Sequence, residues 1–159
     1  MTAIQITIPL IFAVAAVAMT FFRRMPACLV AYAAFVSAGL LGVMRIPVDQ
    51  YIIWGFIVFI DTINIYATRM QPTRSMQLYT VVGCLTGTLL GWLGGTLAIV
   101  MVGGALGAAL GFLAYTRTPQ GQAHPSGLAH RLSMFAGAAC TAWFTFDLVA
   151  VVVAALFTT

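Results

Sequence analysis

The 159-residue chain contains no lysine, and only 6% of its residues are charged, whereas 62% are hydrophobic. Soluble domains carry about a quarter charged residues, so the mean hydropathy of +1.06 predicts an integral membrane protein. No polar stretch is long enough for a separate soluble domain, and we expect a single domain, residues 1–159. The net charge of +4 comes from arginines in short connections, where it indicates membrane topology and not nucleic-acid binding.

The missing lysine also excludes a nucleotide site in the glycine-rich runs at residues 91–95 and 103–107. A phosphate-binding loop of the usual kind requires a lysine and a preceding strand. The sequence offers neither of these features around the two runs.

Histidine and cysteine are scarce as well. His124 and His130 lie in a polar stretch, and Cys28, Cys84 and Cys140 lie in apolar segments without CxxC spacing. A metal site needs further ligands within reach, so we expect no metal and no cofactor, with solvated histidines and buried cysteines. Hydrolysis would require a nucleophile with a positioned base, and the two intramembrane aspartates lack the adjoining glycines expected of a protease dyad. We therefore expect no enzymatic activity.

Six apolar segments are candidates for membrane spans of about 20 residues, and together they predict an all-α membrane bundle. The segments are residues 3–22, 27–44, 51–67, 79–93, 97–115 and 132–157. We expect the first to be a retained span, because its arginines follow the apolar run and do not precede it as in a signal peptide. Residues 116–131 are rich in proline, glycine, serine and glutamine, which predicts a mobile cytoplasmic loop.

Between residues 83 and 111, glycine recurs at every fourth position with one exception, Ile99. The glycines are Gly83, Gly87, Gly91, Gly95, Gly103, Gly107 and Gly111. This spacing places them on one stripe of a helix, and in lipid small residues let two helices pack closely. A single helix over residues 79–114 would be about 54 Å long, whereas the hydrocarbon core is about 30 Å thick. We therefore predict a glycine-zipper hairpin that turns near residues 94–96.

The arginines give independent support for the hairpin. With six spans and both termini outside, six of the seven arginines lie on the cytoplasmic side and only Arg45 lies opposite. The six are Arg23, Arg24, Arg69, Arg74, Arg117 and Arg131. A single crossing by the glycine stretch would reduce this bias to four against three.

Two aspartates, Asp61 and Asp147, lie near the middle of apolar segments. An acidic side chain at the bilayer centre costs at least about 2.5 kcal/mol on insertion scales, so each requires a reason. Asn64 lies on the same helical face as Asp61. One hypothesis is that these three residues line a polar route that binds a cation or passes protons. The alternative is that both acids are protonated and hydrogen-bonded to threonines, Ser37 or Asn64 as contacts between helices.

Residues 103–113, GGALGAALGFL, resemble the GPFLGALLGEL-type segment of a widespread bacterial family of small glycine-zipper membrane proteins catalogued as a domain of unknown function. Three glycines occupy the same places, namely Gly103, Gly107 and Gly111. Upstream, ATRMQPTRS at residues 67–75 is similar to the Gly-x-basic-basic-x-Gly-x-Ser connection of that family, and Met25-Pro26 is similar to its Leu-Pro-Gly-Pro turn.

The sequence also departs from the pattern of that family. Phe112 stands where the family has a glutamate, Gly104 replaces a proline, and the glycines around Met25-Pro26 are missing. Any role of that glutamate is therefore absent from this chain. The resemblance implies a six-segment fold, which we expect in the bacterial cytoplasmic membrane, and it implies no activity.

These features lead to two hypotheses about function. The first is a small carrier or pore-like transporter that uses Asp61 and Asp147 for ion or proton coupling. The second is a non-catalytic packing or scaffold subunit of a membrane assembly. The expected partners are the lipid bilayer and either further copies of the chain or another membrane protein.

Overall fold

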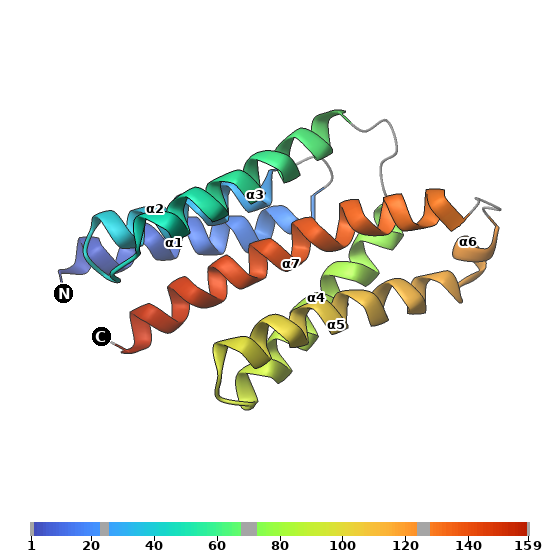
Figure 1. Cartoon of the computed structure of the whole chain (residues 1–159). Coiled ribbons are helices and arrows are strands. Elements are labelled where there is room, and N and C mark those ends of the chain that lie inside the picture. Colours follow the sequence, from blue (N-terminus) through green and yellow to red (C-terminus); the bar gives the residue numbers. More distant parts are fainter. Residues whose placement is uncertain (1, 23–25, 68–72, 124–127, 159) are drawn as a thin grey trace.

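The computed structural model of the chain describes residues 2–22, 26–67, 73–123 and 128–158 (Figure 1). Within these ranges the chain forms helices and no strand, which confirms the predicted all-α class. The helices are α1 (Ala3–Thr20), α2 (Ala27–Leu40), α3 (Val48–Ala67), α4 (Arg74–Leu93), α5 (Leu97–Thr116), α6 (Pro119–Gln122) and α7 (Leu128–Thr158).

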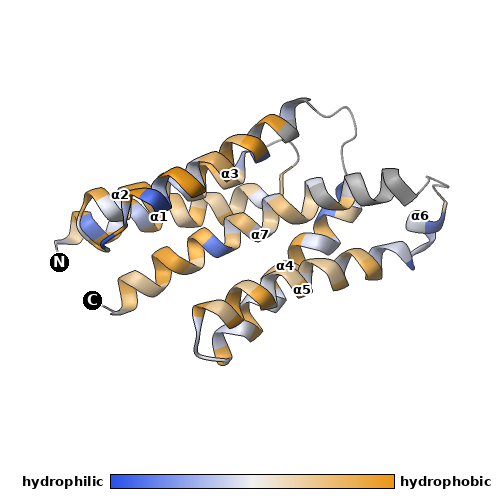
Figure 2. Cartoon of the chain, viewed as in Figure 1, coloured by the Kyte–Doolittle hydropathy of each residue, from blue (hydrophilic) through white to orange (hydrophobic). Residues whose placement is uncertain are grey.

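Four helices in the described part of the chain are long and apolar enough to cross a membrane. They are α1, α4, α5 and the segment Gly137–Phe157 of α7. Figure 2 shows hydrophobic residues along most of the length of these helices. With 14 residues, α2 is shorter than a span of typical length. The apolar helices are compatible with a membrane protein, and the predicted set of six spans goes beyond these four.

The second helix ends at Leu40, four residues before the predicted end at residue 44. The cause is Gly42, whose φ of 73° lies in the left-handed region that favours glycine. The N–H of Gly42 donates to Gly39 O (3.1 Å) and the N–H of Val43 donates to Ala38 O (2.9 Å), which is a Schellman motif. Residues 41–47 then form a short connection to α3.

Two other boundaries differ from the prediction because of threonine caps. Thr73 accepts a hydrogen bond from the N–H of Met76 (3.3 Å), so α4 begins at Arg74 and not at residue 79. Thr118 accepts from the N–H of Gly121 (3.1 Å) and starts α6 inside the predicted loop 116–131. The last helix begins at Leu128, four residues before the predicted start at 132, and His124 lies outside the described residues.

The long helix α7 lies in the middle of the bundle, with α1, α2 and α3 on one side and α4 and α5 on the other (Figure 1). One buried cluster joins α1, α2 and Val58 of α3 to Leu148 and Val152 of α7. A second joins α4 and α5 to Ala139, Ala142 and Phe146 of α7. Every other long helix therefore contacts α7.

The helices alternate in direction, so their ends fall into two groups (Figure 1). At one end of the bundle, Gln77 Nε2 donates to Thr20 O (2.9 Å) and the hydroxyls of Thr73 and Tyr115 lie 3.1 Å apart. At the other end, Gln5 Nε2 donates to Leu41 O (2.8 Å).

The helices α4 and α5 are in near-backbone contact along a line of glycines, which we call the glycine seam. A Cβ atom on any of them would meet the backbone of the opposite helix; the members are Gly83, Gly87, Gly91, Gly103, Gly107 and Gly111. Gly95, which the spacing placed in the same stripe, instead lies in the turn with a φ of 76° and no atom near its Cβ position. Gly104, which the spacing omitted, faces Thr88 and Trp143.

Candidate polar site within the bundle

The face of α3 that carries Asp61 is fixed against α2 and α7 by a line of contacts. Tyr32 of α2 donates its hydroxyl hydrogen to Tyr51 O (2.8 Å), and Trp54 packs edge-on against Phe144 of α7. Val58 is buried in the same cluster. Asp61 follows Val58 by three residues, so it continues this inward face of the helix.

Asp61 is only 4% exposed. Its Oδ1 accepts a hydrogen bond from the hydroxyl of Thr141 on α7 (3.0 Å), whereas Oδ2 has no hydrogen-bond partner among the described residues. The Thr141 oxygen also lies 3.0 Å from Gly137 O. The same hydroxyl hydrogen can therefore point either to the carboxyl or to its own helix.

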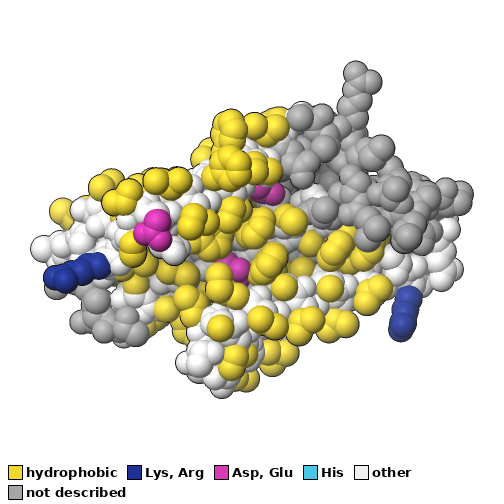
Figure 3. All heavy atoms as spheres, viewed as in Figure 1, with side chains coloured by type: hydrophobic (Ala, Val, Ile, Leu, Met, Phe, Trp, Pro, Cys, Tyr) yellow, Lys and Arg dark blue, Asp and Glu magenta, His cyan; other side chains and the backbone are white. Residues whose placement is uncertain are grey.

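Asp147 lies on α7 and is 1% exposed. Its Oδ1 has no hydrogen-bond partner in the part of the chain that the structure describes. Asp147 stands ten residues from each end of the apolar segment Gly137–Phe157, which places it midway along that segment. Figure 3 shows apolar side chains over most of one face of the bundle, with acidic groups visible between them.

The two acids do not face each other across α7. Asp147 follows Thr141, the partner of Asp61, by six residues, which corresponds to about 9 Å along the helix and about 120° around it. No hydrogen bond joins the two carboxyls within the described residues. Asp61, on α3, and Asp147, on α7, therefore lie at different heights along α7 and on different sides of it.

Most hydroxyls near these acids are used within their own helices. Thr145 is fully buried and donates to Thr141 O (2.6 Å). Thr88 of α4 donates to Cys84 O (2.9 Å). Ser37, one of the partners considered for the acids, donates instead to Ala34 O (2.8 Å). Thr141 therefore gives the one hydroxyl contact to an acid that we find in the described residues.

Two further polar residues of α3 lie close to Asp61 in the sequence. The side chain of Asn64 lies outside the described residues, so its predicted place in the polar route stays a prediction. Thr62 was missed by the sequence reasoning, although its hydroxyl oxygen is buried without a partner among the described residues. Adjacent residues of a helix point about 100° apart, so its position directly after Asp61 gave no signal of this.

The titratable groups close to the acids are thiols. Cys28 of α2 and Cys140 of α7 lie within electrostatic range of Asp61, and Cys84 of α4 lies within range of Asp147. No charged side chain acts on either carboxyl in the described ranges. Those ranges also contain no group of three or more His, Cys, Asp or Glu side chains that could hold a metal ion.

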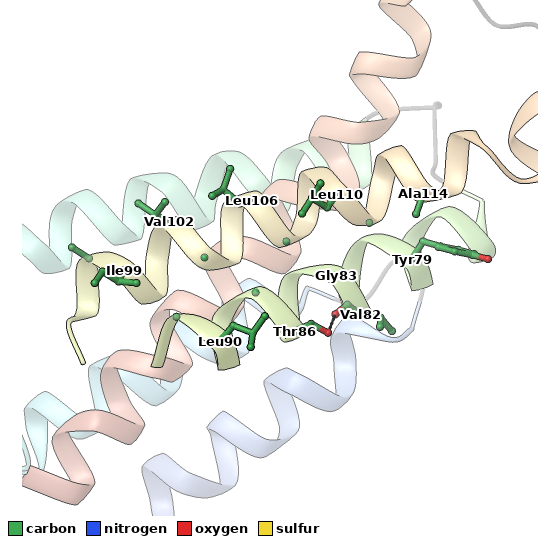
Figure 4. Close-up of a pocket in the computed structure, with 16 residues that line it drawn as sticks. Tyr79, Val82, Gly83, Thr86, Leu90, Ile99, Val102, Leu106, Leu110 and Ala114 are labelled. Carbon is green, nitrogen blue, oxygen red and sulfur yellow. Dashed lines mark hydrogen bonds between the residues drawn. The ribbon is translucent and has the colours of Figure 1, made fainter. Parts of the chain in front are cut away.

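An apolar groove of about 830 Å³ lies on the outer face of α4 and α5. Figure 4 shows its floor along the glycine seam, with Val82, Leu90, Val102 and Leu106 among the side chains that form its walls. Thr86 lines the groove as well, but its hydroxyl donates to Val82 O (2.8 Å). The groove therefore suits a largely apolar occupant, and the hydroxyl of Tyr79 is the other polar side-chain group in its lining (Figure 4).

Comparisons of the chain with protein-family models, curated proteins and solved structures found no match. The resemblance to the bacterial glycine-zipper family stays a prediction. The features that bear on function are therefore the buried acids and the helices that position them.

Proposed function

We propose that this protein is a small polytopic membrane transporter in which Asp61 and Asp147 bind the ion that crosses the bilayer. Asp147 carries the argument, because its carboxyl is buried midway along an apolar segment and has an oxygen without a described partner. Acids inside a membrane are costly and often mark ion or proton pathways. An acid that serves only to join helices is expected to have its oxygens used in hydrogen bonds.

The two acids provide binding positions at different depths. Asp61 lies six residues before the end of α3 at Ala67, or about 9 Å from that end of the helix. Asp147 lies ten residues before Phe157, or about 15 Å from the opposite end. An ion that visits both acids would therefore cross the bilayer in shorter steps.

The proposed topology has six spans, with α2 and α3 crossing the membrane alongside the four long apolar helices. The hairpin of α4 and α5 is a glycine zipper in this proposal, and the membrane is the bacterial cytoplasmic membrane. Arg74 at the start of α4 and Arg117 at the end of α5 share one end of the bundle, whereas Arg45 lies at the other. The positive-inside rule makes the first of these ends cytoplasmic.

Transport should depend on Asp147 and not on acidic residues in general. Uptake of protons, Na⁺ and Rb⁺ is measured separately in liposomes that contain the purified protein. For at least one of these ions, the uptake should exceed the leak into empty liposomes. Asp147→Asn should return that flux to the empty-liposome level, because the amide cannot bind a cation or exchange a proton as a carboxyl does. Asp49→Asn is the matched control, since Asp49 is exposed at the start of α3.

The apolar groove favours a second candidate function, a packing or scaffold subunit that holds a helix of another membrane protein. The two functions give different results in the same preparations. Absence of flux for every ion, together with a stoichiometric foreign subunit after purification in mild detergent, would favour the scaffold. Flux that survives Asp61→Asn and Asp147→Asn would remove the basis for the proposed transporter.

The orientation can be tested by cysteine labelling after Cys28, Cys84 and Cys140 are replaced by alanine. Gln122 in α6 and Asp49 in α3 are both exposed and lie at opposite ends of the bundle. An impermeant maleimide added to intact cells should label Asp49→Cys and should label Gln122→Cys only after the cells are opened. The reverse pattern would contradict the proposed orientation, and labelling of both variants from outside would contradict the six-span topology.

A further inference from the structure

Both buried acids lie on uninterrupted helices. Asp61 is inside α3 (Val48–Ala67) and Asp147 is inside α7 (Leu128–Thr158), and neither helix has a break at its acid. Transporters that bind Na⁺ typically use broken helices, in which unwound backbone carbonyls and helix ends supply oxygen ligands. Carbonyls in a continuous helix are already occupied by N–H groups. The backbone around these acids therefore offers few ligands to a metal ion.

The described side chains do not supply the missing ligands either. Hard cations such as Ca²⁺ and Mg²⁺ take six or more oxygen ligands. In the described residues, Asp61 has the hydroxyl of Thr141 within hydrogen-bond distance and the hydroxyl of Thr62 next to it in the chain. Around Asp147, the titratable group found to interact with it electrostatically among the described residues is the thiol of Cys84. Neither acid has a second carboxylate beside it, so neither resembles a metal-ion cage.

We propose that the transported ion is the proton, and that Asp61 and Asp147 exchange protons without binding metal cations. This inference rests on the proposed transport function. At each acid, the carboxylate takes a proton from hydronium, which leaves water and a neutral carboxylic acid; the reverse step returns the proton to water nearer the other surface. An O–H bond forms on the aspartate as one breaks in hydronium, and no other reactant is needed.

The neutral form suits these surroundings better than a metal complex. Asp61 has α2 and α7 packed against its helix, and the titratable groups near it there are the thiols of Cys28 and Cys140. Asp147 has the thiol of Cys84 on α4. No arginine of the described residues forms an ion pair with either acid. A carboxyl without a cationic partner no longer carries the cost of burying a charge once it is protonated.

The ion can be identified with a pH-sensitive dye sealed inside liposomes that contain the protein. We expect the same rate of acidification under a pH gradient whether the medium contains Na⁺, K⁺ or only choline. Asp61→Asn and Asp147→Asn should each reduce that rate to the leak of empty liposomes, and Asp147→Glu should retain part of it. The Asp49→Asn control should behave as the unmodified protein does.

Two outcomes separate this inference from the function on which it rests. Uptake of ²²Na⁺ that depends on Asp147, without acidification, would overturn the assignment of the proton and would leave the transport function standing. No flux of protons, Na⁺ or K⁺ in a folded preparation would overturn both.

An infrared measurement in detergent tests the same inference without transport. A buried neutral carboxylic acid should give a C=O stretching band that shifts in D₂O. Asp147→Asn should remove the part of this band that comes from Asp147. Asp49→Asn should leave the band unchanged, and added Na⁺ or Ca²⁺ should leave it unchanged as well. Loss of the band on addition of either cation would show displacement of the proton by a metal ion and would overturn the inference.

Discussion

Gly87→Leu combined with Gly107→Leu is expected to abolish the folded, monodisperse protein in detergent. A Cβ on Gly87 would meet the carbonyl of Gly103, and a Cβ on Gly107 would meet the carbonyl of Gly83. Overpacking of a well-packed core typically costs about 1–3 kcal/mol per site. Here the obstacle is helix backbone, which cannot rotate aside as a side chain can. Size-exclusion chromatography and a thermal melt should show a loss of many degrees or an aggregated protein.

Gly137→Ala is the matched control for this prediction. Gly137 also lies in a helix, but a Cβ there would meet no atom within 4 Å. Alanine should therefore gain up to about 1 kcal/mol in helix propensity and raise the melting temperature slightly. An unchanged melt and elution of the double leucine variant would mean that the glycines are not a packing surface. An unchanged melting temperature together with a smaller particle in size-exclusion chromatography would place the glycine seam between copies of the chain.

Asp147→Val is expected to raise the melting temperature of the protein while it abolishes transport. A buried polar atom without a partner costs about 1–3 kcal/mol, and an apolar side chain of similar size removes that cost. In the part of the chain that is described, Asp147 Oδ1 is such an atom. The stability gain should appear in a thermal melt in detergent, and the loss should appear in the liposome flux assay.

Two further variants distinguish the loss of the carboxyl from the loss of a buried polar group. Asp147→Asn keeps a buried polar group, so it should lose flux without the same gain in stability. Asp61→Val should gain less than Asp147→Val, because it also removes the hydrogen bond that Thr141 donates to Asp61. A large drop in melting temperature for Asp147→Val would show that the carboxyl stabilises the bundle, which would contradict its assignment as an ion-binding group.

The glycine pattern shows what spacing alone can predict. Residues four apart lie nearly above one another on a helix, so the contacts of Gly83, Gly87, Gly103 and Gly107 follow the predicted stripe. The same rule placed Gly95 in the stripe, where the left-handed turn between the helices interrupts the helical spacing. A regular spacing therefore predicts the contact face only as far as the helix continues.

The inward face of α3 was harder to identify from the sequence. Tyr51, Trp54 and Val58 face the bundle, whereas Phe56 and Phe59 on the outer face are more than 60% exposed. Both faces are apolar, as the proposed topology requires, because the outer face of α3 would then meet lipid. Hydropathy therefore does not distinguish inside from outside here, although it does so for helices in water.

The sequence predicted that Asp61 and Asp147 lie near the middle of apolar segments, but it did not predict how they are arranged. Their separation depends on the rotation of α3 and α7 about their own axes, which is set by packing between segments 80 residues apart, as in the Thr141–Asp61 contact. The central place of α7 likewise depends on long-range packing, since α7 contacts all five other long helices. Local spacing carries no information about either feature.

The tight turns on one side of the bundle limit where other macromolecules can reach the chain. Residues 41–47 and 94–96 are the connections on that side, and Gly42 and Gly95 shorten both. The connections on the other side, residues 21–26, 68–73 and 117–127, are longer in total, and the last of them contains α6. A protease, an antibody or a regulatory protein would therefore find few peptide bonds between helices on the first side. In the proposed orientation, most regulation by soluble proteins would have to come from the cytoplasm.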